Sequence, residues 1–456
     1  MITGRRARIV VTRTSVPRTS LSSKPICIGG HLKRTTLTGE RFGLRWSPSF
    51  VGHFDHRVWV LFFGRIISAT GFSIVMPFLS IYFYEQLGVP MYTVGLVFLV
   101  SSIVGAMGQL AGGEIADRFG RRRVMIGSMG SRAMVFLAIS AAIAISGEFV
   151  LIAVLVWFSN FFGALFEPAS SAMVADIVEP SRRLEAYGLL RIGQNIGWTV
   201  GPLLGGLLAI VGFSALFLLT AMTAFSVSII ILILITESMR AGVKPHSFSV
   251  KDLAHFRKDR QFAAFCIISV FLFLVVAQMS SVYSVYSTSV VGVAIYEVGY
   301  LYAINGIMVV FIQMPIARFI ARYRMTSVVA VGAVLYAIGY FSVAFAGDFL
   351  ALAVCMVVIS MGEIVTSPSS MNLVANMSPE NERGRYMGVF GLFQQFGWSM
   401  GPFVGGVLMS AFVTVPYLLW GGISIFAFAS AIGYMLLRSR MREEYDRVGM
   451  KPPCAD

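Results

Sequence analysis

The sequence predicts an all-α membrane protein with twelve transmembrane helices, arranged as two pseudo-symmetric six-helix bundles. Composition is the first observation: hydrophobic residues make up 57% of the 456 residues and charged residues 13%. A typical soluble domain is about 25% charged, so this chain has too few charges to cover several soluble cores. The other two observations are twelve apolar runs of membrane-spanning length and an internal repeat that relates the two halves.

The apolar runs define the predicted helices. A bilayer core about 30 Å thick is spanned by about 20 apolar residues in a helix. The expected spans are 58–83, 91–113, 124–145, 150–174, 186–210, 213–236, 262–287, 296–320, 326–346, 349–373, 386–410 and 414–437. They divide the chain into an N-terminal half (58–236), a cytoplasmic linker (237–261), a C-terminal half (262–437) and a cytoplasmic tail (438–456).

Positively charged residues are concentrated in alternate loops. The loop after the second span carries Arg118, Arg121, Arg122 and Arg123, whereas the loop 85–93 contains neither Lys nor Arg. Cytoplasmic loops are enriched in these residues. We therefore expect a multi-pass protein of the cell membrane with both termini in the cytoplasm. The net charge of +14 then reflects orientation in the lipid bilayer, and no nucleic-acid partner is expected.

Residues 1–57 form a basic extension with eleven Arg or Lys and no long apolar run. They lack the apolar core of a secretory signal. An organelle transit peptide is one interpretation. A disordered cytoplasmic tail and a start codon placed too early are the other two, and we favour these.

Several functional classes lack support in the sequence. The four cysteines show no CxxC spacing and no His cluster accompanies them, so neither a metal site nor a disulfide framework is expected. All five histidines lie outside the spans, and no phosphate-binding GxxxxGK[ST] occurs. We therefore expect no cofactor and no enzyme. A non-transporting receptor on the same fold remains an alternative.

An internal repeat relates the two halves at a spacing of 200 residues. The repeated residues are Gly188, Gln194, Gly197, Trp198, Gly201, Pro202, Gly205 and Gly206, which recur as Gly388, Gln394, Gly397, Trp398, Gly401, Pro402, Gly405 and Gly406. A second register, at a spacing of 204, aligns Gly95 with Gly299 and Arg118 with Arg322. Such parallel duplications bind their substrate near the membrane midplane, between halves that rock against one another.

The repeated glycines suggest close helix packing. Gly197, Gly201 and Gly205 are four residues apart and share one helix face, where another helix can approach closely. Pro202 removes a backbone hydrogen bond and allows a kink. We expect a hinge and packing element here, and a second one at Gly401, Pro402 and Gly405.

The loop after the second span carries a family signature. Its sequence, Gly113-Glu-Ile-Ala-Asp117-Arg118-Phe-Gly120-Arg121-Arg-Arg, resembles the motif G-x-L-x-D-R-x-G-R-[RK] of the major facilitator superfamily, with Ile in place of Leu. In that family the loop latches the two halves in one state of alternating access. We expect Gly113 to end a helix and Asp117 to face a helix N-terminus. Arg118 and Arg121 can pair with carboxylates or lipid headgroups.

The corresponding loop of the second half is degraded. Ala317, Ala321 and Arg324 stand at the positions of the motif's Gly, Asp and second Gly. We therefore expect an asymmetric latch, with the acidic loop only in the first half.

The fifth span resembles the antiporter signature of drug:proton exporters through its glycine and proline series. The resemblance covers 58–437 and implies the major facilitator fold. It also implies a monomeric secondary active transporter that exports small amphipathic organic molecules in exchange for protons. A metabolite importer or uniporter is the alternative. The family's intramembrane Arg of the fourth span is Ser159 here, so the proton relay stays open.

Charged residues inside the spans are candidates for proton coupling, because each costs about 2.5–3.5 kcal/mol to insert. Arg65 and Glu167 lie at equal depth and can form an ion pair, which serves either structure or function. Glu363 has no obvious basic partner in its own half and is suited to bind and release a proton. Glu363 is therefore the first candidate and Glu167 the second. Arg191 is a further charge near the cytoplasmic end of the fifth span.

Polar side chains of the seventh and eighth spans are candidates for the substrate cavity. They are Gln278, Tyr283 and Tyr286 in the seventh span and Asn305 in the eighth. An apolar cavity with a few polar groups suits an amphipathic organic substrate. An interhelical hydrogen bond is an equally good interpretation of Asn305.

Overall fold

The structure is a computed structural model that describes residues 54–145, 147–179, 182–238, 259–379, 383–443 and 445–447. Within these residues the chain forms twelve helical spans and no β-strand. The predicted N-terminal extension (1–57) and linker (237–261) lie mostly outside the described residues. The same is true of residues 448–456 of the predicted tail.

The first six spans form one bundle. They are α1 (His56–Ile81) with its π-helical continuation η2 (Tyr82–Gln86), α2 (Met91–Phe119), α3 (Arg121–Ile145), α4 (Phe149–Ile177), α5 (Arg183–Ala209) and α6 (Phe213–Leu234). Within the bundle α1 packs against α5 and α6, α2 against α4, and α3 against α4 and α6. Each span therefore has at least one extensive neighbour inside its own half.

The second six spans repeat these pairings. They are α8 (Arg260–Val276) with η4 (Ala277–Ser280) and α9 (Val282–Ser289), α10 (Ile295–Ile320), α11 (Met325–Val343), α12 (Phe349–Met377), α13 (Arg383–Phe412) and α14 (Pro416–Arg440). Here α8 packs against α13 and α14, α10 against α12, and α11 against α12 and α14. The second bundle thus has the helix pairing of the first, as a duplication requires.

The seventh span is interrupted, although the sequence predicts one helix over 262–287. The α-helix ends at Val276, a 3₁₀ turn follows, and Ser281 leaves the helical conformation with φ −130° and ψ −90°. The Gln278 side chain lies at this break and donates to the carbonyl oxygens of Leu274 (3.0 Å) and Gly401 (2.8 Å). The bond to Gly401 ties the interrupted span to α13.

α5 and α13, the repeated pair, are not among the helices that are apolar enough, in their described residues, to be candidate membrane spans. In the described residues the other ten are long and apolar enough to cross a membrane by length and composition. α5 packs against α1 and α10, and α13 packs against α8 and α2. Because protein covers each of these helices on two sides, they need less apolar surface than a helix that faces lipid.

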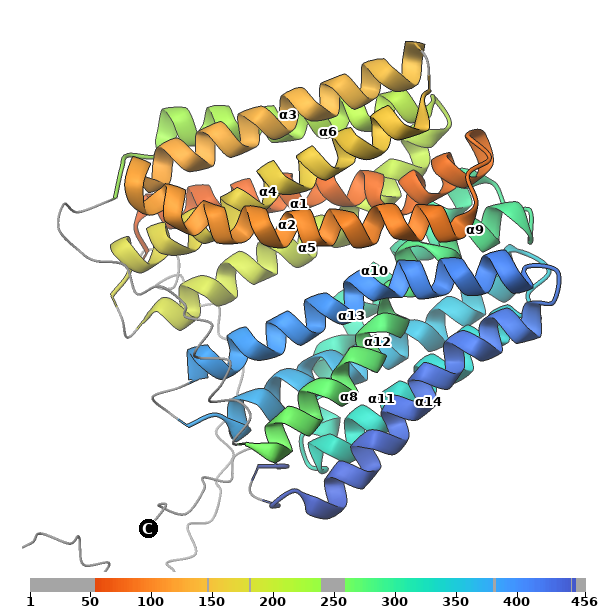
Figure 1. Cartoon of the computed structure of the whole chain (residues 1–456). Coiled ribbons are helices and arrows are strands. Elements are labelled where there is room, and N and C mark those ends of the chain that lie inside the picture. Colours follow the sequence, from red (N-terminus) through yellow and green to blue (C-terminus); the bar gives the residue numbers. More distant parts are fainter. Residues whose placement is uncertain are drawn as a thin grey trace, which may run out of the picture. The chain divides into compact units, whose positions relative to one another are not determined.

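The two bundles meet through these same helices, with α5 on α10 and α13 on α2 (Figure 1). The contacts are close: a Cβ placed on Gly299 would lie 3.0 Å from the Cα of Gly206 and 3.1 Å from the carbonyl oxygen of Pro202. A Cβ on Gly95 would lie 2.6 Å from the Cα of Phe403. Gly299 of α10 therefore packs against the Gly-Pro series of α5. Gly95 of α2, its counterpart in the 204-residue register, packs against the Gly-Pro series of α13.

Candidate functional site

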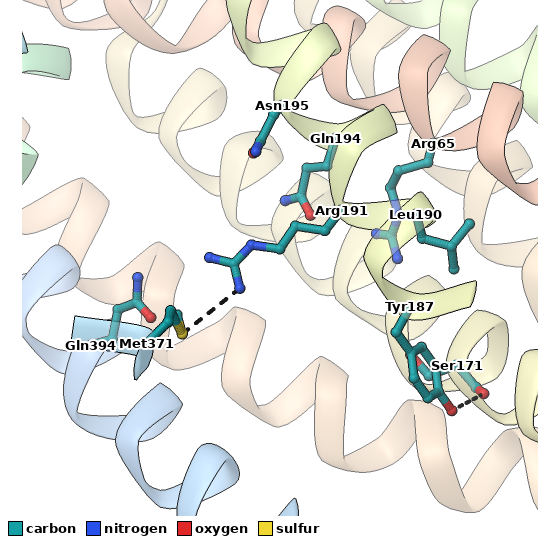
Figure 2. Close-up of a pocket in the computed structure, with 9 residues that line it drawn as sticks. All are labelled: Arg65, Ser171, Tyr187, Leu190, Arg191, Gln194, Asn195, Met371 and Gln394. Atoms are coloured by element: carbon teal, nitrogen blue, oxygen red, sulfur yellow. Dashed lines mark hydrogen bonds between the residues drawn. The ribbon is translucent and has the colours of Figure 1, made fainter. Parts of the chain in front are cut away.

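A cavity of about 360 Å³ lies between the two bundles. Its lining residues are Arg65, Ser171, Tyr187, Leu190, Arg191, Gln194, Asn195, Met371 and Gln394 (Figure 2). They come from α1, α4 and α5 on one side and from α12 and α13 on the other. Ser171 is near the end of α4 and Tyr187 near the start of α5, so the cavity lies toward the ends of the bundles that carry the basic loops.

α5 supplies most of the polar wall. Tyr187, Arg191, Gln194 and Asn195 recur at helical spacing and share one face of α5. The Tyr187 hydroxyl donates to the carbonyl oxygen of Ser171 at 3.1 Å. Gln194 lies in the wall of the first bundle and its repeat partner Gln394 in the wall of the second (Figure 2). The duplicated amides therefore line the same cavity from two sides.

The expected ion pair between Arg65 and Glu167 is present and joins α1 to α4. Arg65 is buried, whereas the Glu167 side chain is 41% exposed. The guanidinium also lies 5.8 Å from the centroid of the Phe166 ring. This pair therefore leaves little net charge on the α1 wall of the cavity.

Glu363 lies inside the second bundle and does not line the cavity. Its Oε2 accepts a hydrogen bond of 2.8 Å from Asn305 Nδ2, which also donates to Ser360 Oγ at 3.0 Å. The Tyr336 ring packs against Gly362, the residue before Glu363, where an added Cβ would lie 3.0 Å from the ring. The carboxyl group thus has a neutral amide partner on α10, and no basic partner is found for it among the described residues.

The other cavity candidates of the seventh span are packed within the second bundle. Gln278 is fully buried at the helix break. The Tyr283 hydroxyl donates to the carbonyl oxygen of Leu352 at 3.0 Å. Tyr286 stands edge-on to Trp420 with 5.2 Å between the ring centroids. In this conformation these three side chains connect helices of one bundle and lie away from the cavity wall.

The signature loop is tied to the end of α6 by Glu237. Its carboxylate accepts hydrogen bonds from the backbone N–H groups of Arg121 (3.0 Å) and Arg122 (3.1 Å), the first residues of α3. A carboxylate is favourable at a helix N-terminus. The sequence predicts that Asp117 occupies such a position, but Glu237 takes that place at α3. Asp117 instead pairs with the Arg121 guanidinium at 2.8 Å, and Asp176 lies 3.3 Å from the same group.

Two other expectations for this loop change. Gly113 does not end a helix, because α2 continues to Phe119. Gly120 ends it instead, with a φ of 99° that favours glycine. Gly112 makes the close approach, since a Cβ there would lie 2.8 Å from the Cα of Leu165. Arg118 is exposed and pairs with Glu114.

The second half closes its loop with an acid from the tail. The Asp446 carboxylate accepts hydrogen bonds of 2.7 Å from the backbone N–H and the hydroxyl of Thr326, at the start of α11. It also forms an ion pair of 2.6 Å with Arg324 Nε. Asn376, the repeat partner of Asp176, donates to the carbonyl oxygens of Tyr445 and Arg447. The loop of the second half itself carries no acid, as the sequence predicts, but the tail supplies one at the start of α11.

The repeated glycines lie against the first helix of each bundle. A Cβ on Gly197 would lie 2.6 Å from the backbone nitrogen of Thr70 in α1, and one on Gly201 2.6 Å from its carbonyl oxygen. In the second bundle a Cβ on Gly401 would lie 2.7 Å from the carbonyl oxygen of Leu274. Gly205 and Gly405 continue these faces against Ile74 and Val282. Both Pro202 and Pro402 lie within unbroken helices.

Sequence reasoning missed one intramembrane charge, Arg132 in α3. Its side chain is buried, and its guanidinium carbon lies 4.9 Å from the centroid of the Phe72 ring and 5.3 Å from that of Phe136. A Cβ on Gly163 would lie 2.7 Å from the same carbon. The signal was available, since Arg132 stands in the middle of the apolar run 124–145. Glu237 and Asp446 carried no comparable signal.

Comparison with known proteins identifies the class. The sequence profile of the Major Facilitator Superfamily matches residues 61–402 and 289–451. Among solved structures, a bacterial homolog to the human lysosomal transporter Spinster has a TM-score of 0.70 at 14% identity, covering 86% of this chain and 98% of that chain. The twelve-helix architecture is that of a membrane transporter. The chain belongs to the major facilitator superfamily.

Curated relatives match only part of their length. The uncharacterized MFS-type transporter YqjV of Bacillus subtilis is 35% identical over 147 residues, which is 32% of this chain and 35% of the relative. A Na⁺, Li⁺, K⁺/H⁺ antiporter of Planococcus maritimus is 32% identical over 32% of this chain and 34% of its own length. The multidrug resistance protein MdtG of Proteus mirabilis is 28% identical over 45% of this chain and 51% of its own length. The chain thus aligns with about a third to a half of these relatives.

Proposed function

We propose that this protein is a secondary active transporter that exports small amphipathic organic molecules by alternating access, in exchange for protons. The observation that carries the proposal is the cavity between the bundles, which lies toward the basic loops. At the ends of the helices away from the basic loops, glycine contacts such as Gly206 on Gly299 join the two bundles. Rocking of the bundles about the cavity would expose it first to one side of the membrane and then to the other.

Orientation in the membrane and direction of transport rest on separate observations. Because Lys and Arg are enriched in cytoplasmic loops, we assign the basic loops and both termini to the cytoplasm of the cell membrane. The cavity then faces the cytoplasm in this conformation. Export is supported by the Gly-Pro series of α5 and by relatives that are named multidrug resistance proteins. A monomer is the proposed transporting unit.

Proton coupling is assigned first to Glu363. Its partner Asn305 is adjacent to Gly306, and a Cβ on Gly306 would lie 3.1 Å from the Cβ of Thr199 in α5. A proton on Glu363 changes how the carboxyl group and Asn305 bond to each other. Gly306, the residue after Asn305 in α10, packs against α5 of the other bundle. A change in the hydrogen bond between Glu363 and Asn305 is therefore passed to the interface between the bundles. Glu167, paired with Arg65 beside the cavity, is the second coupling candidate.

The test is substrate-driven proton flux in proteoliposomes that contain the dye pyranine. We expect members of a panel of amphipathic compounds to release protons from the wild-type vesicles. Glu363→Gln should lose this coupled flux, whereas Glu148→Gln, an exposed residue before α4, should keep it. Substrate uptake without proton movement would favour the importer or uniporter alternative. Undiminished flux in Glu363→Gln would remove Glu363 from the mechanism.

A further inference from the structure

We infer that the cavity between the bundles binds an organic anion, whose negatively charged group lies against Arg191. Anion binding can be tested by itself, whereas the role of the anion as a transported substrate rests on the proposed function. The inference deepens that function, because it gives the chemical class of the substrate for the same cavity.

The cavity wall carries a net positive charge. Two arginines and no carboxylate are among the nine lining residues. Arg65 is neutralised by Glu167. Among the described residues, Arg191 has one polar contact, the thioether sulfur of Met371 at 3.9 Å from its Nη1 (Figure 2). A thioether is a weak acceptor. The positive charge of Arg191 therefore has no carboxylate partner among the described residues.

The repeat shows that the fold does not need this charge. The position that corresponds to Arg191 in α13 is Gly391, although α13 packs against α8 and α2 as α5 packs against α1 and α10. The amide at Gln194 is kept as Gln394, in the same cavity. The Arg191 side chain is exposed on the cavity wall, and its cation has no counterpart at the matching position of the second half. Arg191 therefore serves something other than helix packing.

The surroundings of Arg191 describe the ligand. Gln194 and Asn195 follow it by three and four residues, so their amides share its helix face and add hydrogen-bond donors. A guanidinium binds carboxylates, phosphates and sulfonates with two parallel hydrogen bonds. Leu190 and Met371 add apolar surface, and methionine adapts to varied shapes. The volume of about 360 Å³ suits a small ligand. These features fit a small organic anion with an apolar body, and they disfavour a cation.

Three probes of one shape test the charge preference: 4-phenylbutyrate, 4-phenylbutanamide and 4-phenylbutylamine. Binding to the purified full chain in nanodiscs is measured by calorimetry. We expect the carboxylate to bind wild-type protein about tenfold or more tighter than the amide, the scale of one charge-assisted hydrogen bond. The amine should bind most weakly. Arg191→Gln should remove the preference, Arg191→Lys should keep part of it, and Arg260→Gln, an exposed arginine at the start of α8, should behave as wild type.

The opposite outcomes are distinct. The inference is overturned if wild type binds the amide or the amine as tightly as the carboxylate, if it binds no carboxylate, or if Arg191→Gln keeps the preference. Arg191→Lys keeps the test valid should Arg191→Gln not fold. Flux of the same probes in proteoliposomes separates the two proposals. Carboxylate binding without flux contradicts the transport function alone, and amine flux without carboxylate binding contradicts the anion site alone.

Discussion

Asp446 forms an ion pair with Arg324, with 2.6 Å between the carboxylate oxygen and Nε, and its side chain is fully buried. It occupies the place in the second bundle that Glu237 occupies in the first, at the N-terminus of the third helix. In each bundle, an acid from the segment after the sixth helix therefore accepts hydrogen bonds at the N-terminus of the third helix. The tail after α14 is part of the folded second bundle as far as Arg447.

Removing this acid is expected to destabilise the protein. Asp446→Ala leaves Arg324 and the Thr326 N–H without this partner, at a cost of about 2–4 kcal/mol. Thermal unfolding of the purified protein measures the loss. Glu443→Ala is the matched control in the same segment, because Glu443 forms an exposed pair with Arg447 and should cost under about 1 kcal/mol. Equal melting temperatures for the two variants would contradict the role of Asp446.

The Arg65–Glu167 pair predicts non-additive mutations. Glu167→Gln leaves the buried Arg65 guanidinium unpaired, and Arg65→Gln leaves the carboxylate unpaired. The double variant removes both charges, so it should be closer to wild type than the sum of the singles, with a coupling of about 1–3 kcal/mol. A double-mutant cycle of thermal stabilities measures this value. Additive effects would show that the pair contributes no stability.

The interface between the bundles predicts a shift between conformations. Gly95→Leu puts a side chain against Phe403 and should separate α2 from α13, which moves the population toward the state in which the cavity closes. The measurement is the labelling rate of the thiol in Gln394→Cys, after alanine replaces the four native cysteines. We expect slower labelling. Gly105→Leu, in the same helix with nothing within 4 Å, is the control. An unchanged rate in Gly95→Leu would refute the shift.

Arg132 and Gly163 should be energetically coupled. Gly163→Val places methyl groups where the Arg132 guanidinium lies, and we expect a loss of about 1–3 kcal/mol from overpacking. Adding Arg132→Leu should recover part of that loss, because the shorter side chain leaves room. Gly127→Val, on α3 with nothing within 4 Å, is the control. Thermal unfolding that shows no recovery would mean that Arg132 does not fill this space.

Features that depend on nearby residues were predictable from the sequence. The apolar runs locate the twelve spans because each helix satisfies its own backbone hydrogen bonds in lipid. The Arg65–Glu167 pair was predictable from charge and depth, since opposite charges stand at the same level of the first and fourth spans, although folding was needed to bring these spans together. The break at Gln278 was not predicted; the hydrogen bond at this place is made with the carbonyl group of Gly401 in α13, which is distant in the sequence.

The sequence by itself determined that this is a duplicated twelve-helix membrane protein, because hydropathy and repeats are properties of the chain. Only the tertiary structure decided which acids bind the N-termini of α3 and α11 and which charged side chains line the cavity. Glu237 and Asp446 look like ordinary residues after a helix until folding brings them to the N-termini of α3 and α11. The physical reason is that a carboxylate stabilises a helix N-terminus only within hydrogen-bond distance, and packing of distant segments sets that distance.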